Sequence, residues 1–81
     1  MRVLIQERAR KELRKLDPGT AEKILKKIAS LESFPELPNI KRLKNFYPPF
    51  RMRVGEYRVL FDVEEEQLIV VSVRHRKEAY R

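Results

Sequence analysis

Hydrophobic positions in the first half of the chain repeat every three or four residues, which is the period of an amphipathic helix. The first set is Ala9, Leu13 and Leu16, and the second is Ala21, Ile24, Leu25, Ile28 and Leu31. Asp17 and Pro18 stand between the two sets, and aspartate caps a helix while proline suits its first position. The pattern predicts a short basic helix over residues 7–16 and a second helix from Pro18 to near Phe34 and Pro35.

The segments that flank these helices have a different composition. Val3, Leu4 and Ile5 form an apolar run that is too short for a helix, so it predicts a first strand. Residues 35–49 contain four of the five prolines of the chain. They predict an irregular connector with a brief edge strand near residues 41–43.

After Pro49 the hydrophobic positions alternate with polar ones, and β-branched and aromatic residues become frequent. This period of two predicts three antiparallel strands over residues 51–54, 57–63 and 68–73.

The register of the first hairpin follows if Gly55 and Glu56 form a two-residue turn. The cross-strand pairs are then Val54 with Tyr57, Arg53 with Arg58, Met52 with Val59, and Arg51 with Leu60. Because side chains alternate between faces, two sets separate. The face toward the helices carries Met52, Val54, Tyr57 and Val59, and the opposite face carries Arg51, Arg53, Arg58, Leu60 and Asp62.

The second turn, at residues 64–66, decides where the last strand places its side chains. A three-residue turn, which we favour, puts Arg74 and Arg76 on the face of the other arginines. A two-residue turn shifts the register of that strand and reverses which face each side chain occupies.

Together these elements predict an α+β fold: an N-terminal strand and a helical hairpin packed on one face of a small, mostly antiparallel sheet, with a short helical turn at the C-terminus. The 81 residues allow one compact domain, residues 1–81. The absence of cysteine excludes disulfides and favours a reducing compartment, the cytoplasm. No apolar run approaches the roughly 20 residues that span a bilayer, so no membrane association is expected.

The chain has an excess of positive charge, and arginines of the predicted sheet contribute to it. The chain carries 19 Lys+Arg and 12 Asp+Glu, a net charge of +7 that favours a polyanionic partner such as nucleic acid. Arg53 directly across from Arg58 is repulsive by roughly a few tenths of a kcal/mol, and an anion between the two would relieve it. Guanidinium groups match phosphate with two parallel hydrogen bonds, so we expect a bound phosphodiester here. The alternative is a solvated salt-bridge network in which Asp62 neutralises one arginine.

Three further features bear on the chemistry. The acidic run at residues 64–66 is typical of a solvated turn, so we predict neither a metal site nor a cofactor. His75 is the only histidine, which excludes acid–base catalysis by a histidine pair; it is either a strand-end residue or a single proton carrier. Tyr80 either stacks on a nucleobase or packs back over the sheet.

The segments FRMRVGEYRVLFDVE and VSVRHRKEAYR, preceded by the predicted helical hairpin, resemble the RelE/ParE toxin superfamily, and most of all its RelE branch. The resemblance covers essentially the whole chain. It implies the toxin of a bacterial or archaeal toxin–antitoxin pair, restrained by a small RelB-like antitoxin. The RelE branch further implies ribosome-dependent, metal-independent cleavage of messenger RNA in the ribosomal A site, by attack of the substrate's own 2′-OH on the adjacent phosphate.

The resemblance also implies the site. The basic cluster of the family corresponds to Lys44, Arg51, Arg53, Arg58 and Arg76, and its C-terminal tyrosine to Tyr80. We assign catalysis to Arg51, Arg53, Arg58, Arg76 and Tyr80, and RNA binding to Lys44, Arg74, His75 and Arg81. Arg53 and Arg58 would stabilise charge on the phosphate, and Arg76 would lie near the leaving 5′-oxygen. Tyr80 would stack on the nucleotide.

One departure from the family concerns the general base. Arg51 and Arg53 occupy positions where lysine is frequent, and arginine is a poor base because its pKa exceeds about 12. Tyr80 or His75 could take the proton, or the step could rely on positioning and electrostatics. Two other functions stay open: inhibition of DNA gyrase by a ParE-like toxin, and RNA binding by a catalytically degenerate module.

Overall fold

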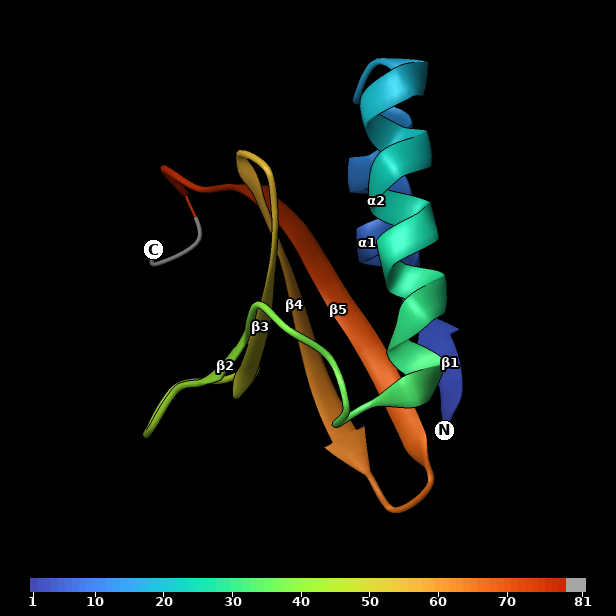
Figure 1. Cartoon of the computed structure of the whole chain (residues 1–81). Coiled ribbons are helices and arrows are strands. Elements are labelled where there is room, and N and C mark those ends of the chain that lie inside the picture. The colour runs from blue at the N-terminus through green and yellow to red at the C-terminus, as the bar shows by residue number, and fades with distance from the viewer. Residues whose placement is uncertain (79–81) are drawn as a thin grey trace.

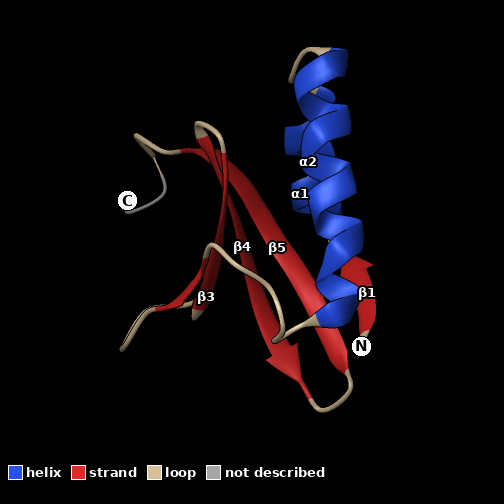
Figure 2. Cartoon of the chain, in the orientation of Figure 1, coloured by secondary structure: helices blue, strands red, loops and turns tan. Residues whose placement is uncertain are grey.

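The fold is a two-layer α+β arrangement, seen in a computed structural model that describes residues 1–78 (Figures 1 and 2). Its elements are β1 (Arg2–Ile5), α1 (Glu7–Arg14), α2 (Pro18–Ser30), a 3₁₀ turn (Leu31–Ser33), β2 (Ile40–Arg42), β3 (Phe50–Val54), β4 (Tyr57–Glu64) and β5 (Gln67–His75). The strands form one five-stranded sheet in the order β1-β5-β4-β3-β2. Only β1 and β5 run parallel within it, so the predicted fold class is confirmed.

Both helices begin where the sequence predicts, but α1 ends at Arg14 and α2 at Ser30, earlier than the predicted ends near residues 16 and 34. The side chain of Asp17 caps α2 by accepting hydrogen bonds from the amide of Thr20 at 3.0 Å and from its hydroxyl at 2.7 Å. Pro18 is the first residue of α2. Both helices cover one face of the sheet (Figure 1) and form the core with it. The buried core residues are Ala9, Leu13, Ile24, Ile28, Leu31, Met52, Val59, Phe61, Leu68, Val70 and Val73.

The β3–β4 hairpin has the predicted register. Arg53 pairs with Arg58, Val54 with Tyr57, and the remaining pairs follow in step. Gly55, the first residue of the turn, has φ 57°, a left-handed conformation that favours glycine. The first turn of the sheet therefore follows from local sequence, because a two-residue turn with glycine fixes the pairing of both strands.

The β4–β5 turn is different from the one we favoured, and the three-residue turn is wrong. Glu64 pairs with Gln67, so only Glu65 and Glu66 lie between the strands. This two-residue turn alone would send Arg74 to the helix-covered face. A β-bulge at Val71 inserts one extra residue into β5 and restores the parity, so that Leu60 pairs with Ser72 and Arg58 with Arg74.

The connector between the 3₁₀ turn and β3 contains the expected brief edge strand, β2, which pairs with β3. Beyond β2 the connector forms a loop, which the hydrogen bond from the Leu43 amide to the Pro49 carbonyl closes at 2.6 Å. After β5, residues 76–78 form a turn with a hydrogen bond from the Glu78 amide to the His75 carbonyl at 2.8 Å. In the described part of the chain, no helix is both long enough and apolar enough to span a bilayer.

Candidate nucleic-acid interface

Three arginines stand side by side on adjacent strands, on the face of the sheet opposite the helices. Arg53 of β3 pairs with Arg58 of β4, and Arg58 pairs with Arg74 of β5. We call these three residues the arginine row. Like charges paired directly across antiparallel strands destabilise a sheet, so the row is expected to be unfavourable without a ligand. An anion bound across the row would remove that repulsion.

Arg58, the central residue of the row, is half-buried and held by its own hairpin. Its Nη1 donates to the carbonyl of Tyr57 at 3.2 Å and to that of Gly55 at 3.5 Å. The turn that sets the register thus also orients this guanidinium. Arg53 is exposed and forms no ion pair with any residue in 1–78.

Arg51 lies next to the row, two residues before Arg53 on the same face of β3 and opposite Leu60. Burial lowers the pKa of its guanidinium, and the neighbouring positive charge of Arg58 lowers that pKa further. The first cause reflects partial burial of Arg51, and the second reflects the positive charge of its neighbour. An anionic ligand bound nearby would raise the pKa of Arg51 again, because a negative charge favours the charged guanidinium.

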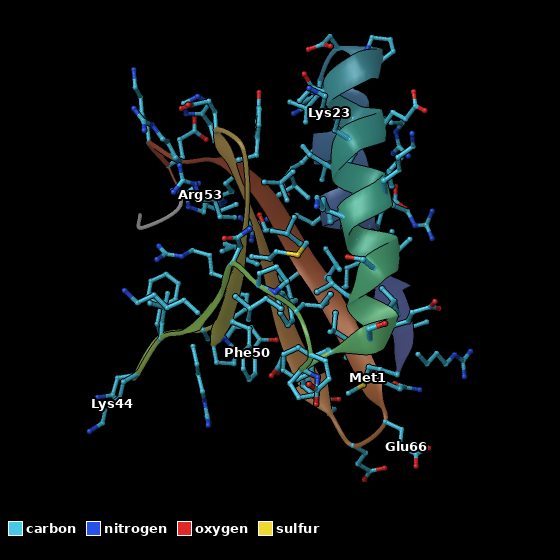
Figure 3. The ribbon with its side chains drawn as sticks, viewed as in Figure 1. Met1, Lys23, Lys44, Phe50, Arg53 and Glu66 are labelled. Atoms are coloured by element: carbon cyan, nitrogen blue, oxygen red, sulfur yellow. The ribbon has the colours of Figure 1, made fainter. Side chains whose placement is uncertain are left out.

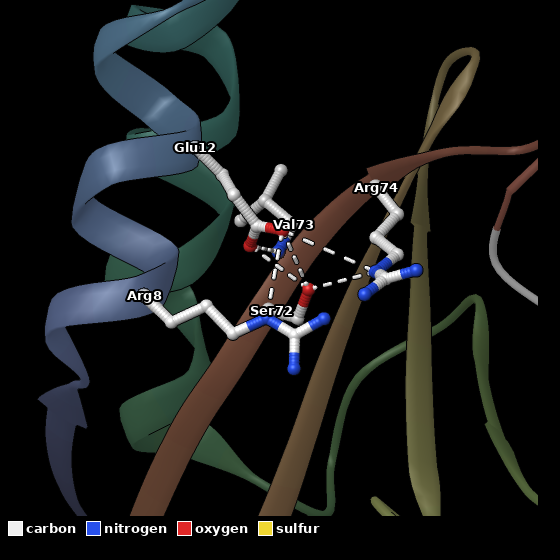
Figure 4. Close-up of polar contacts among 5 residues, drawn as sticks. All are labelled: Arg8, Glu12, Ser72, Val73 and Arg74. Carbon is white, nitrogen blue, oxygen red and sulfur yellow. Dashed lines mark hydrogen bonds and ion pairs between the residues drawn. The ribbon is translucent and has the colours of Figure 1, made fainter.

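Arg74 is held from α1 by Glu12, a residue that the sequence did not single out (Figure 4). Its Nε donates to the hydroxyl of Ser72 at 3.2 Å and lies 4.0 Å from a carboxylate oxygen of Glu12. That carboxylate also accepts the Ser72 hydroxyl at 2.8 Å and the Val73 amide at 2.9 Å. Arg8, one turn earlier on α1, approaches it at 3.8 Å.

The position of Glu12 follows from the shape of the sheet. The edge strand β1 covers β5 only as far as Val70, the last residue of its register. Beyond it the edge of β5 exposes amides that need an acceptor, and Glu12 supplies one to Val73. In sequence Glu12 looks like one more polar residue on a charged helix. No local pattern marks it, because its partners lie 60 residues away.

The remaining predicted site residues do not all lie beside the arginine row. Arg76 binds Glu56 through its side chain at 2.9 Å and its backbone amide at 2.7 Å, which brings it to the same turn as Arg58. Lys44 lies in the connector, well apart from Arg53 (Figure 3). Tyr80 and Arg81 lie outside the described residues.

His75 is on the other side of the sheet from the arginine row. It pairs with Tyr57, and the two rings meet edge to face with centroids 5.4 Å apart. Its Nδ1 accepts the amide of Lys77 at 3.3 Å. The structure therefore does not bring the His75 side chain together with the arginine row.

The proposed neutralising role of Asp62 is not observed. Its carboxylate accepts a hydrogen bond from the Val63 amide at 2.8 Å and forms no ion pair with an arginine among residues 1–78. The row keeps its positive charge except at Arg74, which Glu12 partly balances.

Comparisons with known proteins agree with this fold. Residues 3–80 match the model of the family described as "ParE toxin of type II toxin-antitoxin system, parDE". The putative toxin RelE1 of Methanocaldococcus jannaschii is 32% identical over 84 residues, which cover 98% of this chain and 93% of that protein.

Two solved structures are similar over nearly the full chain. The toxin in the RelB–RelE antitoxin–toxin complex from Methanococcus jannaschii superimposes with a TM-score of 0.75 and 25% identity, covering 95% of this chain and 94% of that one. The isolated Escherichia coli RelE toxin gives a TM-score of 0.73 and 26% identity, covering 98% and 89% respectively. The chain therefore belongs to the RelE/ParE toxin superfamily of type II toxin–antitoxin systems.

Proposed function

We propose that this toxin is an endoribonuclease that cleaves messenger RNA in the ribosomal A site without a metal ion. The arginine row carries the proposal, because three arginines paired across adjacent strands on one face of the sheet would offer guanidinium donors to a phosphodiester. The similarity to proteins named as RelE toxins supports the same reaction class.

In the proposed reaction, the 2′-oxygen of a ribose attacks the adjacent phosphorus and gives its proton to water. A bond from that oxygen to phosphorus forms while the bond to the 5′-oxygen breaks, and the leaving oxygen takes up a proton from water. The products are a 2′,3′-cyclic phosphate and a free 5′-OH. RNA thus supplies its own nucleophile.

The residues of this chain would act mainly by electrostatics. Arg53 and Arg58 stabilise the extra negative charge on the pentacovalent phosphorus, and Arg51 adds to the field beside them. Arg76 pairs with Glu56 at the turn that also orients Arg58, and in this proposal it leaves that pair to approach the leaving oxygen. Removing one such donor from an enzyme typically lowers the rate about 10²–10³-fold.

The position of His75 bears on proton transfer. It lies across the sheet from the row, so it is not the general base in this proposal. Orientation of the nucleotide remains assigned to Tyr80, and the loss of the proton relies on positioning of the 2′-OH against the phosphate.

The test is cleavage of a defined message in a translating extract. The wild-type protein is expected to cut within the A-site codon, and Arg58→Ala to cut at least about 100-fold more slowly. Lys23→Ala, on the exposed surface of α2, is the matched control and is expected to cut as wild type does (Figure 3). An intact message with the wild-type protein would refute the proposal.

The second candidate function is inhibition of DNA gyrase, which the ParE description of the matching family favours. Expression in cells separates the two: gyrase-dependent DNA breakage with intact messages supports a ParE-like toxin, whereas message cleavage with intact DNA supports the endoribonuclease. If neither occurs while RNA binding persists, the chain is a degenerate RNA-binding module.

A RelB-like antitoxin is the proposed partner, because the similar Methanococcus toxin was solved bound to one. The edge strands and the exposed apolar side chains Leu4 and Leu25 are candidate contacts. Co-expression with the product of the adjacent reading frame should restore growth and yield a stable complex on purification.

A further inference from the structure

A small cleft opens on the same face of the sheet as the arginine row, toward α1. Its floor consists of Leu60 and Val71, which are only 4% and 8% exposed although they lie on the face away from the main core. The bulge that restores the register of β5 supplies Val71 to this floor. The cleft encloses about 160 Å³.

The walls of the cleft come from two distant parts of the chain. The connector loop supplies Phe46 and Tyr47, α1 supplies Arg8, and Arg74 lines the cleft as well as belonging to the arginine row. Tyr47 is 69% exposed, the most exposed large hydrophobic side chain among the described residues. An aromatic ring held at a cleft wall beside two guanidiniums has no role in the core.

The two arginines at the rim of the cleft, Arg8 and Arg74, keep hydrogen-bond donors that a ligand can use. Glu12 approaches the Nε atoms of Arg8 and Arg74 at 3.8 and 4.0 Å, distances longer than a close ion pair (Figure 4). The Nη groups of both arginines form no hydrogen bond or ion pair within residues 1–78. The cleft thus combines an apolar floor, an exposed aromatic ring and two cations with donors to spare.

This combination matches a nucleotide better than an acidic peptide. A nucleobase offers a flat face for stacking, and its phosphate accepts from guanidinium groups. The carboxylate of an acidic peptide could also accept from the arginines, but it would leave the exposed ring of Tyr47 without a stacking partner.

We propose that this cleft binds the nucleotide next to the phosphate held by the arginine row, with its base against Tyr47 and its phosphate between Arg8 and Arg74. The inference rests on the proposed function, since it extends the RNA path from the row toward α1. Arg74 belongs to both sites and connects them. Stacking of this kind tolerates any base, so the cleft contributes affinity rather than sequence preference.

The test is direct binding of a fluorescein-labelled, single-stranded hexaribonucleotide with 2′-fluoro sugars, which lack the nucleophile and stay uncut. Fluorescence anisotropy at low salt gives Kd. Tyr47→Ala is expected to bind about 5- to 150-fold more weakly, the factor that corresponds to about 1–3 kcal/mol of stacking. Tyr47→Phe keeps the ring and should bind as wild type does.

Arg8→Gln tests the phosphate contact. It should weaken binding and reduce the slope of log K against log salt by about one, whereas the control Lys23→Gln should change neither. Because Tyr47 and Arg8 are both exposed, these variants are expected to fold, which far-UV circular dichroism checks.

The outcomes separate this inference from the proposed function. If the wild type cuts message in the extract but Tyr47→Ala and Arg8→Gln bind the hexanucleotide as wild type does, the cleft is overturned and the endoribonuclease stands. If binding depends on Tyr47 and Arg8 but no message is cut, the cleft stands and the cleavage proposal fails. Absence of any binding by the wild type at low salt would overturn the cleft as an RNA site.

Discussion

Replacement of Glu12 by alanine should destabilise the fold more than its place on a polar helix surface suggests. The carboxylate accepts hydrogen bonds from the Val73 amide and the Ser72 hydroxyl, and Ser72 is 1% exposed. Hydrogen bonds to a charged group contribute about 1.5–3 kcal/mol each, and the Glu12 side chain is 25% exposed, which reduces that figure. We therefore expect a loss of about 2–4 kcal/mol.

That loss is large compared with the total free energy of unfolding of the domain. An 81-residue domain is stable by roughly 4–12 kcal/mol, taking about 0.05–0.15 kcal/mol per residue. Urea denaturation should show a lower midpoint for Glu12→Ala with an unchanged slope, the sign of a change in stability alone. Glu12→Gln keeps an acceptor but loses the charge, so it should lose about half as much.

Glu22→Ala is the matched control. Glu22 lies in the middle of α2 and pairs with Lys26 at 3.5 Å, with both side chains at least 69% exposed. Such a surface pair contributes about 0.3–0.5 kcal/mol, and the gain in helix propensity is the same for both alanine variants. If Glu12→Ala loses no more stability than Glu22→Ala, the capping of the β5 edge by Glu12 is wrong.

Three further predictions concern the row, a turn and a cap. Arg53→Gln should raise the free energy of unfolding at low salt by roughly 0.2–1 kcal/mol, because it removes a like-charge pair, and should weaken RNA binding; a less stable variant would contradict the repulsion in the row. Gly55→Ala should lower stability by about 1–2 kcal/mol in urea, since the added Cβ meets nothing within 4 Å and only the positive φ opposes it; equal stability would mean that the turn relaxes. The hydrogen bonds from Thr20 lower the pKa of Asp17, so its contribution is present above the unfolded pKa near 3.9 and is lost as pH falls through the folded pKa. Asp17→Ala should therefore melt below wild type at pH 7, and the two melting temperatures should converge in acid; a constant difference would exclude this cap effect.

Much of the fold follows from the sequence because its signals are local. Helical spacing of apolar residues located both helices, and the Asp17-Pro18 pair marked the boundary between them. The two-residue turn at Gly55 fixed the pairing of Arg53 with Arg58, since turn length and alternation together leave one register. The core of the candidate site was therefore predictable.

Other features depend on contacts that no local pattern encodes. The favoured turn at residues 64–66 was wrong, yet Arg74 reached the predicted face because a bulge at Val71 shifts β5 by one residue. The extra residue, Val71, lines a cleft together with residues of α1 and of the connector loop, and those neighbours are distant in the sequence. Arg76 was expected on the arginine face as well. Its ion pair with Glu56 was not predicted, because it forms where the end of β5 lies next to the β3–β4 turn.

Local patterns in the sequence are enough to give the elements, their order, and one hairpin in which two arginines face each other. Long-range contacts settle how a third arginine, Arg74, joins them through the bulge, how Glu12 restrains it from α1, and how Tyr47 comes to line a cleft with it. The two groups of features differ in how far along the chain the interactions that produce them act. Periodicity and turns act over a few residues, whereas an edge amide of β5 finds its acceptor 61 residues away, once the sheet and the helix have packed together.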